Sequence, residues 1–308
     1  MANEELKKAL EEASNKLKSN NNKFNVEEKE AEKVFYDNIN GYAGNPKYEE
    51  IIKCLNVVLE SNKINGFILD GSYGLGKSTL ITSYLKESKK EFVYINSYTT
   101  ALSFYILCWK FKDKIIVIDD VAGIWKDVKG WAILRALLNN DKNRYVKYES
   151  TSDKLTAPSS FIFTGKIIVL CNNIKNHIDD SILSRVMYRK LNFTHKEKLG
   201  IIKEIIKYNY NIVPDGLLEW IKENVDECVV DFNFRSLLKI TEIYLKYPDE
   251  WKGLAMKELE RDEDMAIMKE ILNNYRNVDE QIRIFMQKTT KSRITFFRYK
   301  KRYKELIG

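Results

Sequence analysis

The stretch from Gly71 to Thr79 has residue types and spacing suited to holding a phosphate chain. It reads GSYGLGKST and matches the pattern G-x-x-x-x-G-K-[ST]. Glycines let the main chain turn tightly and bring backbone N–H groups close to phosphate oxygens, because no Cβ intervenes. We expect Lys77 to reach the β- and γ-phosphates and the Ser78 hydroxyl to bind Mg²⁺. The predicted binding residues are Gly71, Ser72, Tyr73, Gly74, Leu75, Gly76, Lys77, Ser78 and Thr79.

A second chemical feature is the carboxylate pair Asp119 and Asp120. It follows four consecutive β-branched residues at 115–118, which are typical of a strand buried on both faces of a parallel sheet. Ligands of such sheets bind at the carboxyl ends of the strands. We therefore expect Asp119 to hold Mg²⁺, directly or through water, and Asp120 to polarise the attacking water. The alternative interpretation is an acidic turn after a buried strand.

The elements that must position these residues alternate between strands and helices, which predicts an α/β fold. Apolar strand patterns and helical periodicities follow one another, and a polar hairpin is expected within 144–163. The expected strands are 67–69, 92–96, 114–118 and 167–171, and the expected helices in this region are 48–60, 80–85, 101–109 and 131–140.

Composition narrows the class of protein. The chain has 308 residues, 44% of them hydrophobic, which is enough for two domains or for one α/β domain with appendages. The longest apolar run, 101–109, is too short to span a bilayer, and the N-terminus carries no apolar leader. The four cysteines lie far apart in the sequence. They are expected to be free thiols in a reducing cytoplasm, which predicts a cytoplasmic protein without a membrane partner.

The net charge of +7 is concentrated at one end of the chain. Residues 279–308 contain nine Lys or Arg and three acids, so the rest of the chain is nearly neutral. A charge this local predicts a local polyanionic partner, and DNA is the obvious one.

With these elements in order, the chain resembles the AAA+ ATPases, which are ring-forming P-loop proteins, over about residues 45–245. Asn172 ends a strand where this family places the sensor-1 residue that helps position the hydrolytic water. The segment 181–186 resembles the one that carries the arginine finger, with Arg185 as the finger and Arg189 in reserve. The segment 232–238 resembles the sensor-2 helix, whose arginine here is Arg235.

The resemblance implies an AAA+ parallel sheet flanked by helices, an α-helical lid and ATP hydrolysis with ATP and Mg²⁺. It also implies a nucleotide-dependent homo-oligomeric ring, expected to be a hexamer. The catalytic set would be Lys77, Asp119, Asp120, Asn172, Arg185 and Arg235, with Ser78 and Asp119 on the metal. Many family members have Asp-Glu where this chain has Asp119-Asp120, so the rate of turnover stays open.

The basic end resembles a helix-turn-helix of the resolvase or transposase type, with helices expected at 262–275, 279–287 and 292–305. We expect Ser292 to cap the last helix, and Ile282, Phe285, Ile294 and Phe297 to form its core. The turn lacks the glycine often found in such motifs. The predicted DNA contacts are Lys288, Lys291, Arg293, Thr295, Arg298, Lys300, Lys301 and Lys304. A solvated basic helix, or a tail that binds an acidic protein, is the alternative.

The predicted domains are a charged N-terminal arm at 1–40, a nucleotide-binding α/β domain at 41–192, a helical lid at 193–250 and a basic helical domain at 251–308. In some ring helicases that resemble this class a hairpin before sensor 1 lines the pore, and here Arg144 and Lys147 would serve it. An ordinary surface excursion of the chain is an equally good interpretation of this hairpin. The function predicted is an ATPase that acts on DNA in replication of a mobile element, virus or plasmid, as initiator, helicase or helicase loader. A partner such as a helicase or another replication protein is then expected. The alternatives are a protein remodeller and a nucleotide-gated regulatory switch.

Overall fold

The computed structural model describes residues 45–96, 99–120, 127–149, 155–172, 178–210, 214–230 and 232–308. The N-terminal arm expected at 1–40 lies outside the described residues.

The centre of the described chain is a sheet of five parallel strands in the order β2-β3-β6-β1-β7. The strands are β1 (Gly66–Gly71), β2 (Phe92–Ile95), β3 (Ile115–Asp119), β6 (Lys166–Cys171) and β7 (Val186–Leu191). The strand β1 that leads into the glycine loop lies between β6 and β7, so both neighbours bring side chains beside the loop. The predicted parallel sheet flanked by helices is confirmed.

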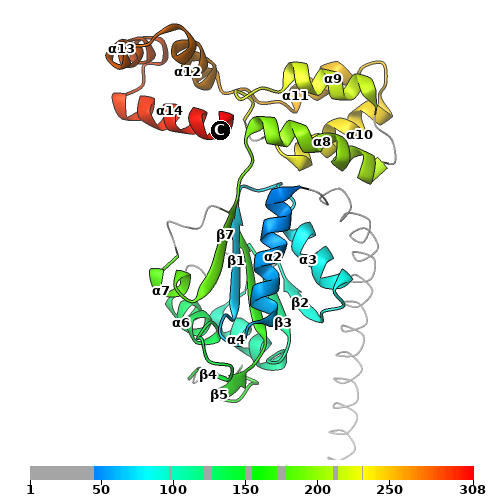
Figure 1. Ribbon diagram of the computed structural model, residues 1–308, viewed down its shortest axis with the longest axis vertical. Helices are drawn as coiled ribbons and strands as arrows, with labels where there is room; N and C mark the ends of the chain where they lie inside the picture. Colours follow the sequence, from blue (N-terminus) through cyan, green and yellow to red (C-terminus); the bar gives the residue numbers. More distant parts are fainter. Residues whose placement is uncertain are drawn as a thin grey trace, which may run out of the picture.

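Helices cover both faces of this sheet because successive side chains of each buried strand point to opposite sides. Phe67 and Leu69 belong to one apolar cluster, with α2 (Pro46–Glu60) and α3 (Lys77–Glu87). Ile68 belongs to a second cluster, with α4 (Ala101–Lys110), α6 (Val128–Leu137) and α7 (Asp180–Leu183). The result is a three-layer α/β/α domain (Figure 1).

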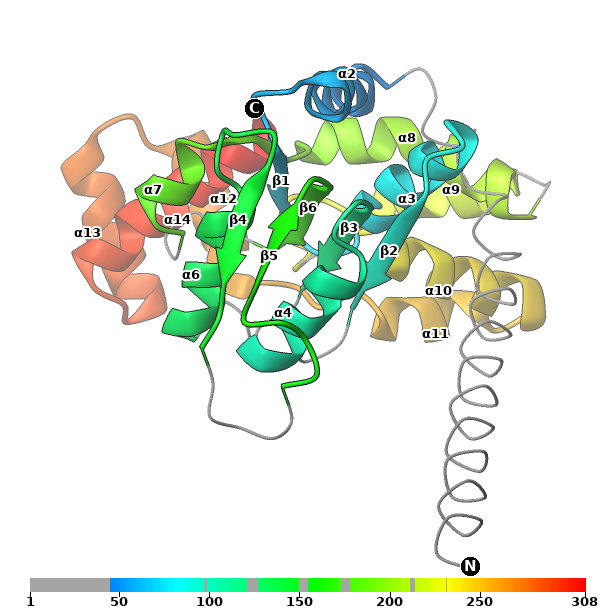
Figure 2. The same ribbon diagram turned by 90° about the horizontal axis from the view of Figure 1, so that it is seen from below.

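A two-stranded antiparallel hairpin, β4 (Arg144–Lys147) and β5 (Ser160–Phe163), lies outside the sheet beside α6 and α4 (Figure 2). The hairpin itself was expected, but the prediction that Arg144 serves it in lining a pore is wrong. The Arg144 side chain is buried, donates to the Gly165 carbonyl and packs on the Phe163 ring. It therefore anchors the hairpin to the domain and cannot meet DNA, whereas Lys147 is exposed beside Glu149.

Above the carboxyl ends of the strands lie two groups of helices (Figure 1). The lid consists of α8 (His195–Tyr210), α9 (Asp215–Asn224), α10 (Phe234–Lys246) and α11 (Trp251–Lys257). The C-terminal bundle consists of α12 (Glu263–Asn274), α13 (Val278–Thr289) and α14 (Arg293–Ile307). The lid shares one apolar cluster with the sheet, while the bundle has a cluster of its own.

The core of the bundle differs from the prediction in part. Ile282 and Phe285 are buried as expected, and the Phe285 ring meets Phe296 edge-on at 5.6 Å. Ile294 and Phe297, however, are 66% and 46% exposed. Phe296, together with Tyr303, takes the inward positions of α14, so Ile294 and Phe297 belong to its surface.

The turn between α13 and α14 contains a strained residue. Thr290 ends α13 with a φ of +58°, in the left-handed region that glycine occupies without cost. Ser292 caps α14 by accepting a hydrogen bond from the Thr295 backbone, as predicted. Among the helices that the structure describes, none is both long enough and apolar enough to cross a membrane.

Candidate nucleotide-binding site

The glycine loop leaves the end of β1 and turns directly into α3. Gly71 lies so close to β7 that an added Cβ would stand 2.3 Å from the Leu191 carbonyl oxygen, so only glycine fits there. Gly74 and Gly76 have φ values of +70° and +73°. Gly76 is the N-cap of α3 without a side chain to cap it, which leaves the first N–H groups of the helix available to an anion.

Lys77 lies inside this loop, 6% exposed, and uses all three of its donors. Its Nζ donates to the Gly71 carbonyl at 2.9 Å, the Ser72 carbonyl at 2.8 Å and Asn172 Oδ1 at 2.8 Å. Burial lowers the pKa of Lys77, and the carboxylates of Asp119 and Asp70 oppose that shift. The structure thus brings the predicted lysine and the predicted sensor-1 amide into direct contact.

Asp119 ends β3 beside the start of α3. Its Oδ2 accepts hydrogen bonds from the Ser78 hydroxyl and from the Tyr94 hydroxyl of β2. Burial, followed by the hydrogen bond to Asp119, raises the pKa of Tyr94. The phenol therefore stays protonated and remains a donor to the carboxylate. Ser78 and Asp119, the two predicted metal residues, lie together.

Asp120 is exposed and has a φ of +50°, in the left-handed region. Its backbone N–H donates to the Leu170 carbonyl at 3.0 Å, which holds the end of β3 against β6. Aspartate and asparagine tolerate this conformation better than other residues with a Cβ. A backbone of this kind at the predicted water-polarising position favours the shorter acid that the sequence has there.

The lid touches the glycine loop through the first residues of α10. The backbone N–H of Phe234 donates to the Gly74 carbonyl at 3.0 Å. Asn233 caps α10 by accepting from the backbone N–H groups of Arg235 and Ser236. Arg235 itself is exposed, and its positive charge reaches Tyr94, whose pKa it lowers slightly against the upward shift.

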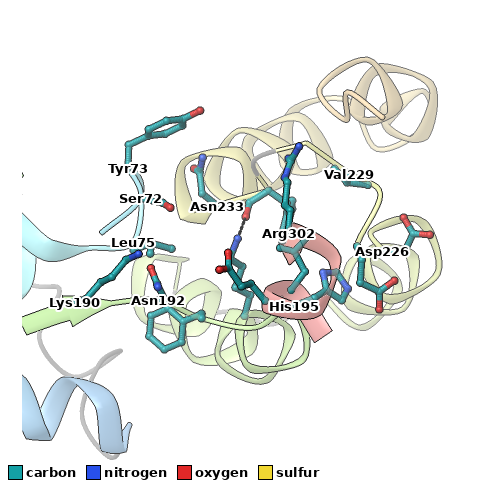
Figure 3. Close-up of a pocket in the computed structure, with 16 residues that line it drawn as sticks. Ser72, Tyr73, Leu75, Lys190, Asn192, His195, Asp226, Val229, Asn233 and Arg302 are labelled. Carbon is teal, nitrogen blue, oxygen red and sulfur yellow. Dashed lines mark hydrogen bonds between the residues drawn. The ribbon is translucent and has the colours of Figure 1, made fainter. Parts of the chain in front are cut away.

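A pocket of about 320 Å³ adjoins the loop on the β7 side (Figure 3). Its walls come from four segments: the loop, the β7–α8 junction, the residues 226–229 and 232–233 before α10, and the C-terminal end of α14. Figure 3 shows Ser72, Asn192, Asp226 and Arg302 from these four segments around one space. The bundle thus helps to enclose a cavity that begins at the loop.

Arg185 lies far from the loop of its own chain. It precedes β7, whose first residue pairs with Gly66, whereas Leu191 pairs with Gly71. Five residues of strand separate the two ends, or about 17 Å at ~3.3 Å per residue. The structure does not bring Arg185 together with the other predicted catalytic residues within one chain. Arg189 is paired with Glu50 at 3.3 Å, so it already has a partner.

The predicted DNA residues divide into two sets. Lys288 is paired with Glu270, Lys291 with Asp264 and Lys300 with the Gln281 amide, while Thr295 takes part in the cap of α14. The other four, Arg293, Arg298, Lys301 and Lys304, are exposed. On a helix of 3.6 residues per turn these four positions lie within about 140° of one another, so they share one broad face, called the basic stripe below, and Ile294 and Phe297 lie between them.

Sequence reasoning missed the roles of three polar residues around the loop. Tyr94 was read only as part of a strand, and no local signal marks it, because its contact with Asp119 depends on strand register. Asp70 is fully buried at the end of β1, where Tyr188 of β7 donates to it at 2.8 Å. Asn233 did have a signal, since an asparagine directly before a helical pattern is a typical N-cap.

The donor set fits a nucleotide triphosphate with Mg²⁺. Lys77 is held by three oxygens whose places phosphate oxygens can take, and Ser78 and Asp119 offer the oxygen ligands that Mg²⁺ prefers. Within the described ranges no cluster of three or more His, Cys, Asp or Glu side chains could hold a metal.

Comparison with solved structures identifies the fold. Two structures of RuvB variants from Thermotoga maritima overlap with the chain at a TM-score of 0.50 each. Sequence identity is 15% and 14%, and the overlap covers 83% and 85% of this chain and 86% of each RuvB chain. Domain III of the Thermotoga maritima replication initiation protein DnaA overlaps less closely, at a TM-score of 0.46 with 19% identity, over 80% of this chain and 95% of that one.

The chain has the AAA+ fold, with its parallel sheet between layers of helices. Identity at this level establishes the fold alone. No protein-family model matches the sequence, and no curated protein sequence matches it either.

Proposed function

We propose that this chain, with its AAA+ fold, binds and hydrolyses ATP and acts on DNA as a ring of identical subunits. The observation that carries the proposal is the direct contact between the glycine loop and the lid, through Phe234 N–H and the Gly74 carbonyl. A phosphate chain in the loop would lie under the lid helix. Nucleotide state and lid position are then linked by a contact between the two backbones.

The chain's own residues would divide the work of phosphoryl transfer. Lys77, released from Asn172, would bind phosphate oxygens, and Asn172 would become free to orient water. Asp120 would polarise that water, while Ser78 and Asp119 would hold Mg²⁺, which neutralises charge on the phosphates. Arg235 would approach from the lid.

The position of Arg185 supports a site shared between subunits. It stands about 17 Å from its own loop, by the strand spacing given above, so any contact with a γ-phosphate must be with that of a neighbouring chain. A finger supplied by a neighbour makes hydrolysis depend on assembly. We propose a closed ring, with six subunits as the starting expectation.

A continuous path of contacts leads from the lid to the C-terminal bundle. The connector that runs into α10 forms an antiparallel bridge between Val229 and Arg261. Within it Asp226 pairs with Arg261, and Glu227 pairs with Lys269 of α12 at 2.7 Å. The segment that precedes Asn233 is therefore held by the bundle, so a lid that moves with nucleotide state would move the bundle.

The exposed stripe of α14 is the proposed DNA contact. Its four cations, Arg293, Arg298, Lys301 and Lys304, face solvent, and most of the protein's net charge lies in this region. Cations arranged along one helix suit phosphate contacts, and a helix of this kind can enter a major groove. A role as initiator, helicase or helicase loader in the replication of a mobile element, virus or plasmid is the finer proposal.

The first test is nucleotide turnover and assembly. We expect Lys77→Ala to abolish binding of ATP, measured calorimetrically, while Lys90→Ala, an exposed lysine just beyond α3, binds as the wild type does. Arg185→Ala should bind ATP but lose turnover. Mixing Arg185→Ala with Lys77→Ala chains should restore part of the turnover, because one interface can then combine an intact loop with an intact finger. A mixture as inactive as its components would count against the shared site.

The second test concerns DNA. Replacing Arg298 by Ala should weaken duplex binding and reduce the slope of log affinity against log salt by about 1. Arg283→Ala is the matched control, since Arg283 is an exposed cation on α13 outside the proposed contact. Equal slopes for the two variants would contradict the assignment.

A protein partner is the second candidate, because Ile294 and Phe297 are exposed within the basic stripe. An apolar pair among cations suits an acidic protein with an apolar patch, as a remodeller or regulatory switch would require. Replacing Phe297 by Ala separates the two cases. The protein partner is favoured by two results together. Phe297→Ala leaves duplex affinity unchanged, and the duplex affinity of the wild type hardly changes with salt concentration.

A further inference from the structure

Tyr94 stands beside the carboxylate proposed to hold the metal. It pairs in register with Val117 of the neighbouring strand, two residues before Asp119. Side chains two apart on a strand point to the same face, so Tyr94, Val117 and Asp119 share one side of the sheet. The Tyr94 hydroxyl reaches along that side and donates to Asp119 Oδ2.

We propose that Tyr94 is a positioning residue that fixes the Asp119 carboxylate in the orientation needed for Mg²⁺. The inference rests on the proposed ATP-binding function and adds to it a residue outside the glycine loop, the sensors and the finger. It concerns the orientation of a ligand, because a neutral phenol is itself a poor ligand for Mg²⁺.

The arrangement of donors explains why a second hydroxyl matters. Ser78 of α3 and Tyr94 of β2 both donate to Oδ2, so among the described residues neither donor occupies the other carboxylate oxygen, which can face a metal or its water. A carboxylate held by one donor can still rotate about its terminal torsion, whereas donors from two separate elements hold its plane. Ser78 is also a proposed metal ligand, so the Tyr94 hydroxyl is the donor that serves orientation alone.

The ring of Tyr94 has a separate, structural task. It packs, partly buried, against the apolar cluster that joins the sheet to α2 and α3. Tyr94→Phe keeps this packing and removes only the hydroxyl. The substitution therefore separates orientation of Asp119 from the stability of the domain.

The test measures binding of a slowly hydrolysed ATP analogue to the full chain by calorimetry, first with EDTA and then over a series of Mg²⁺ concentrations. For Tyr94→Phe we expect unchanged affinity in EDTA and a Mg²⁺ half-saturation concentration raised about tenfold, the usual effect of losing a hydrogen bond behind a metal ligand. Mn²⁺ binding to the protein–nucleotide complex, followed by electron paramagnetic resonance, should weaken in parallel. High Mg²⁺ should restore the affinity for the analogue and, in a separate assay, the turnover of ATP.

The matched control is Tyr105→Phe, which removes another phenol hydroxyl from the same domain. Tyr105 donates to the Pro158 carbonyl at 2.7 Å and belongs to the opposite face of the sheet, so its loss should leave Mg²⁺ dependence unchanged. A Tyr94→Phe protein with wild-type Mg²⁺ dependence overturns the inference. So does one whose affinity falls equally with and without Mg²⁺. A wild type that binds no nucleotide in either condition instead overturns the proposed function, and the inference with it.

Discussion

The contact between lid and loop can be tested by adding a single methyl group. A Cβ built on Gly74 would lie 2.4 Å from Asn233 Oδ1 and 3.0 Å from Asn233 Cβ, and Gly74 has a φ of +70°. Gly74→Ala therefore has two separate costs. The left-handed backbone costs about 1.5 kcal/mol for a residue with a Cβ. Displacing Asn233 costs about another 1.5 kcal/mol, because its cap and the bond from Phe234 N–H to the Gly74 carbonyl are both disturbed.

The two costs can be told apart with a double-mutant cycle. Asn233→Gly alone should cost only a few tenths of a kcal/mol, since glycine is an acceptable N-cap. It also removes every Asn233 atom that the new methyl group would meet. The double variant should then retain the backbone cost and lose the steric one, so the two substitutions should be non-additive by about 1.5 kcal/mol.

Urea unfolding of the nucleotide-free chain, followed by tryptophan fluorescence, suits this measurement. Trp220 and Trp251 belong to the lid, and their rings meet edge-on at 5.1 Å, so their emission reports on the element that the substitutions disturb. If the two free-energy changes simply add, Asn233 does not press on Gly74. The proposed link between lid and loop would then lose its physical basis.

Three further outcomes are expected elsewhere in the chain. Thr290→Gly should stabilise the bundle by about 0.5–1 kcal/mol in thermal unfolding, because it relieves a left-handed backbone; a lower midpoint would contradict this. Burial alone would raise the pKa of Glu227, but the hydrogen bond and charge of Lys269 bring it below its usual value. The stability that the ion pair contributes is complete above the unfolded pKa of Glu227, about 4.5, and is lost as the pH falls through its lower folded pKa. Lys269→Met should therefore unfold with a weaker acid dependence between pH 5 and 3. Arg144→Leu should cost about 2–3 kcal/mol in urea unfolding, because it leaves the carbonyl of Gly165 unsatisfied. It should leave duplex affinity unchanged. Unchanged stability with weaker duplex binding would instead support a DNA role for Arg144.

The parts of the site that were predictable are those encoded by local spacing. The loop from Gly71 and the acids at 119–120 each lie within one short stretch, and parallel strands bring their carboxyl ends to one edge. Asn172 was indicated by the resemblance to AAA+ ATPases, and its contact with Lys77 is a finding of the structure. Tyr94 was not predictable, because its neighbour depends on the register between β2 and β3, which no local pattern records.

The wrong predictions for Arg144 and for Phe297 share a physical cause. In each case the local sequence pattern does not determine which face of the strand or helix is buried. The strand of Arg144 reads Arg-Tyr-Val-Lys, so each face of it carries one basic and one apolar residue, and alternation cannot say which face is buried. On α14 the neighbours Phe296 and Phe297 differ by about 100° around the helix, as 3.6 residues per turn require. Spacing alone permits either ring to enter the core. Packing against Phe285 decided in favour of Phe296.

The backbone of Asp120 has a practical consequence. Since its φ of +50° is one that aspartate and asparagine share, Asp120→Asn exchanges a charge for an amide with no new distortion of the main chain. Asp120→Glu would place a longer side chain on a left-handed backbone, a conformation that such residues avoid. If Asp120 polarises the attacking water as proposed, Asp120→Asn should stop hydrolysis while ATP stays bound, which would give a stationary complex for imaging.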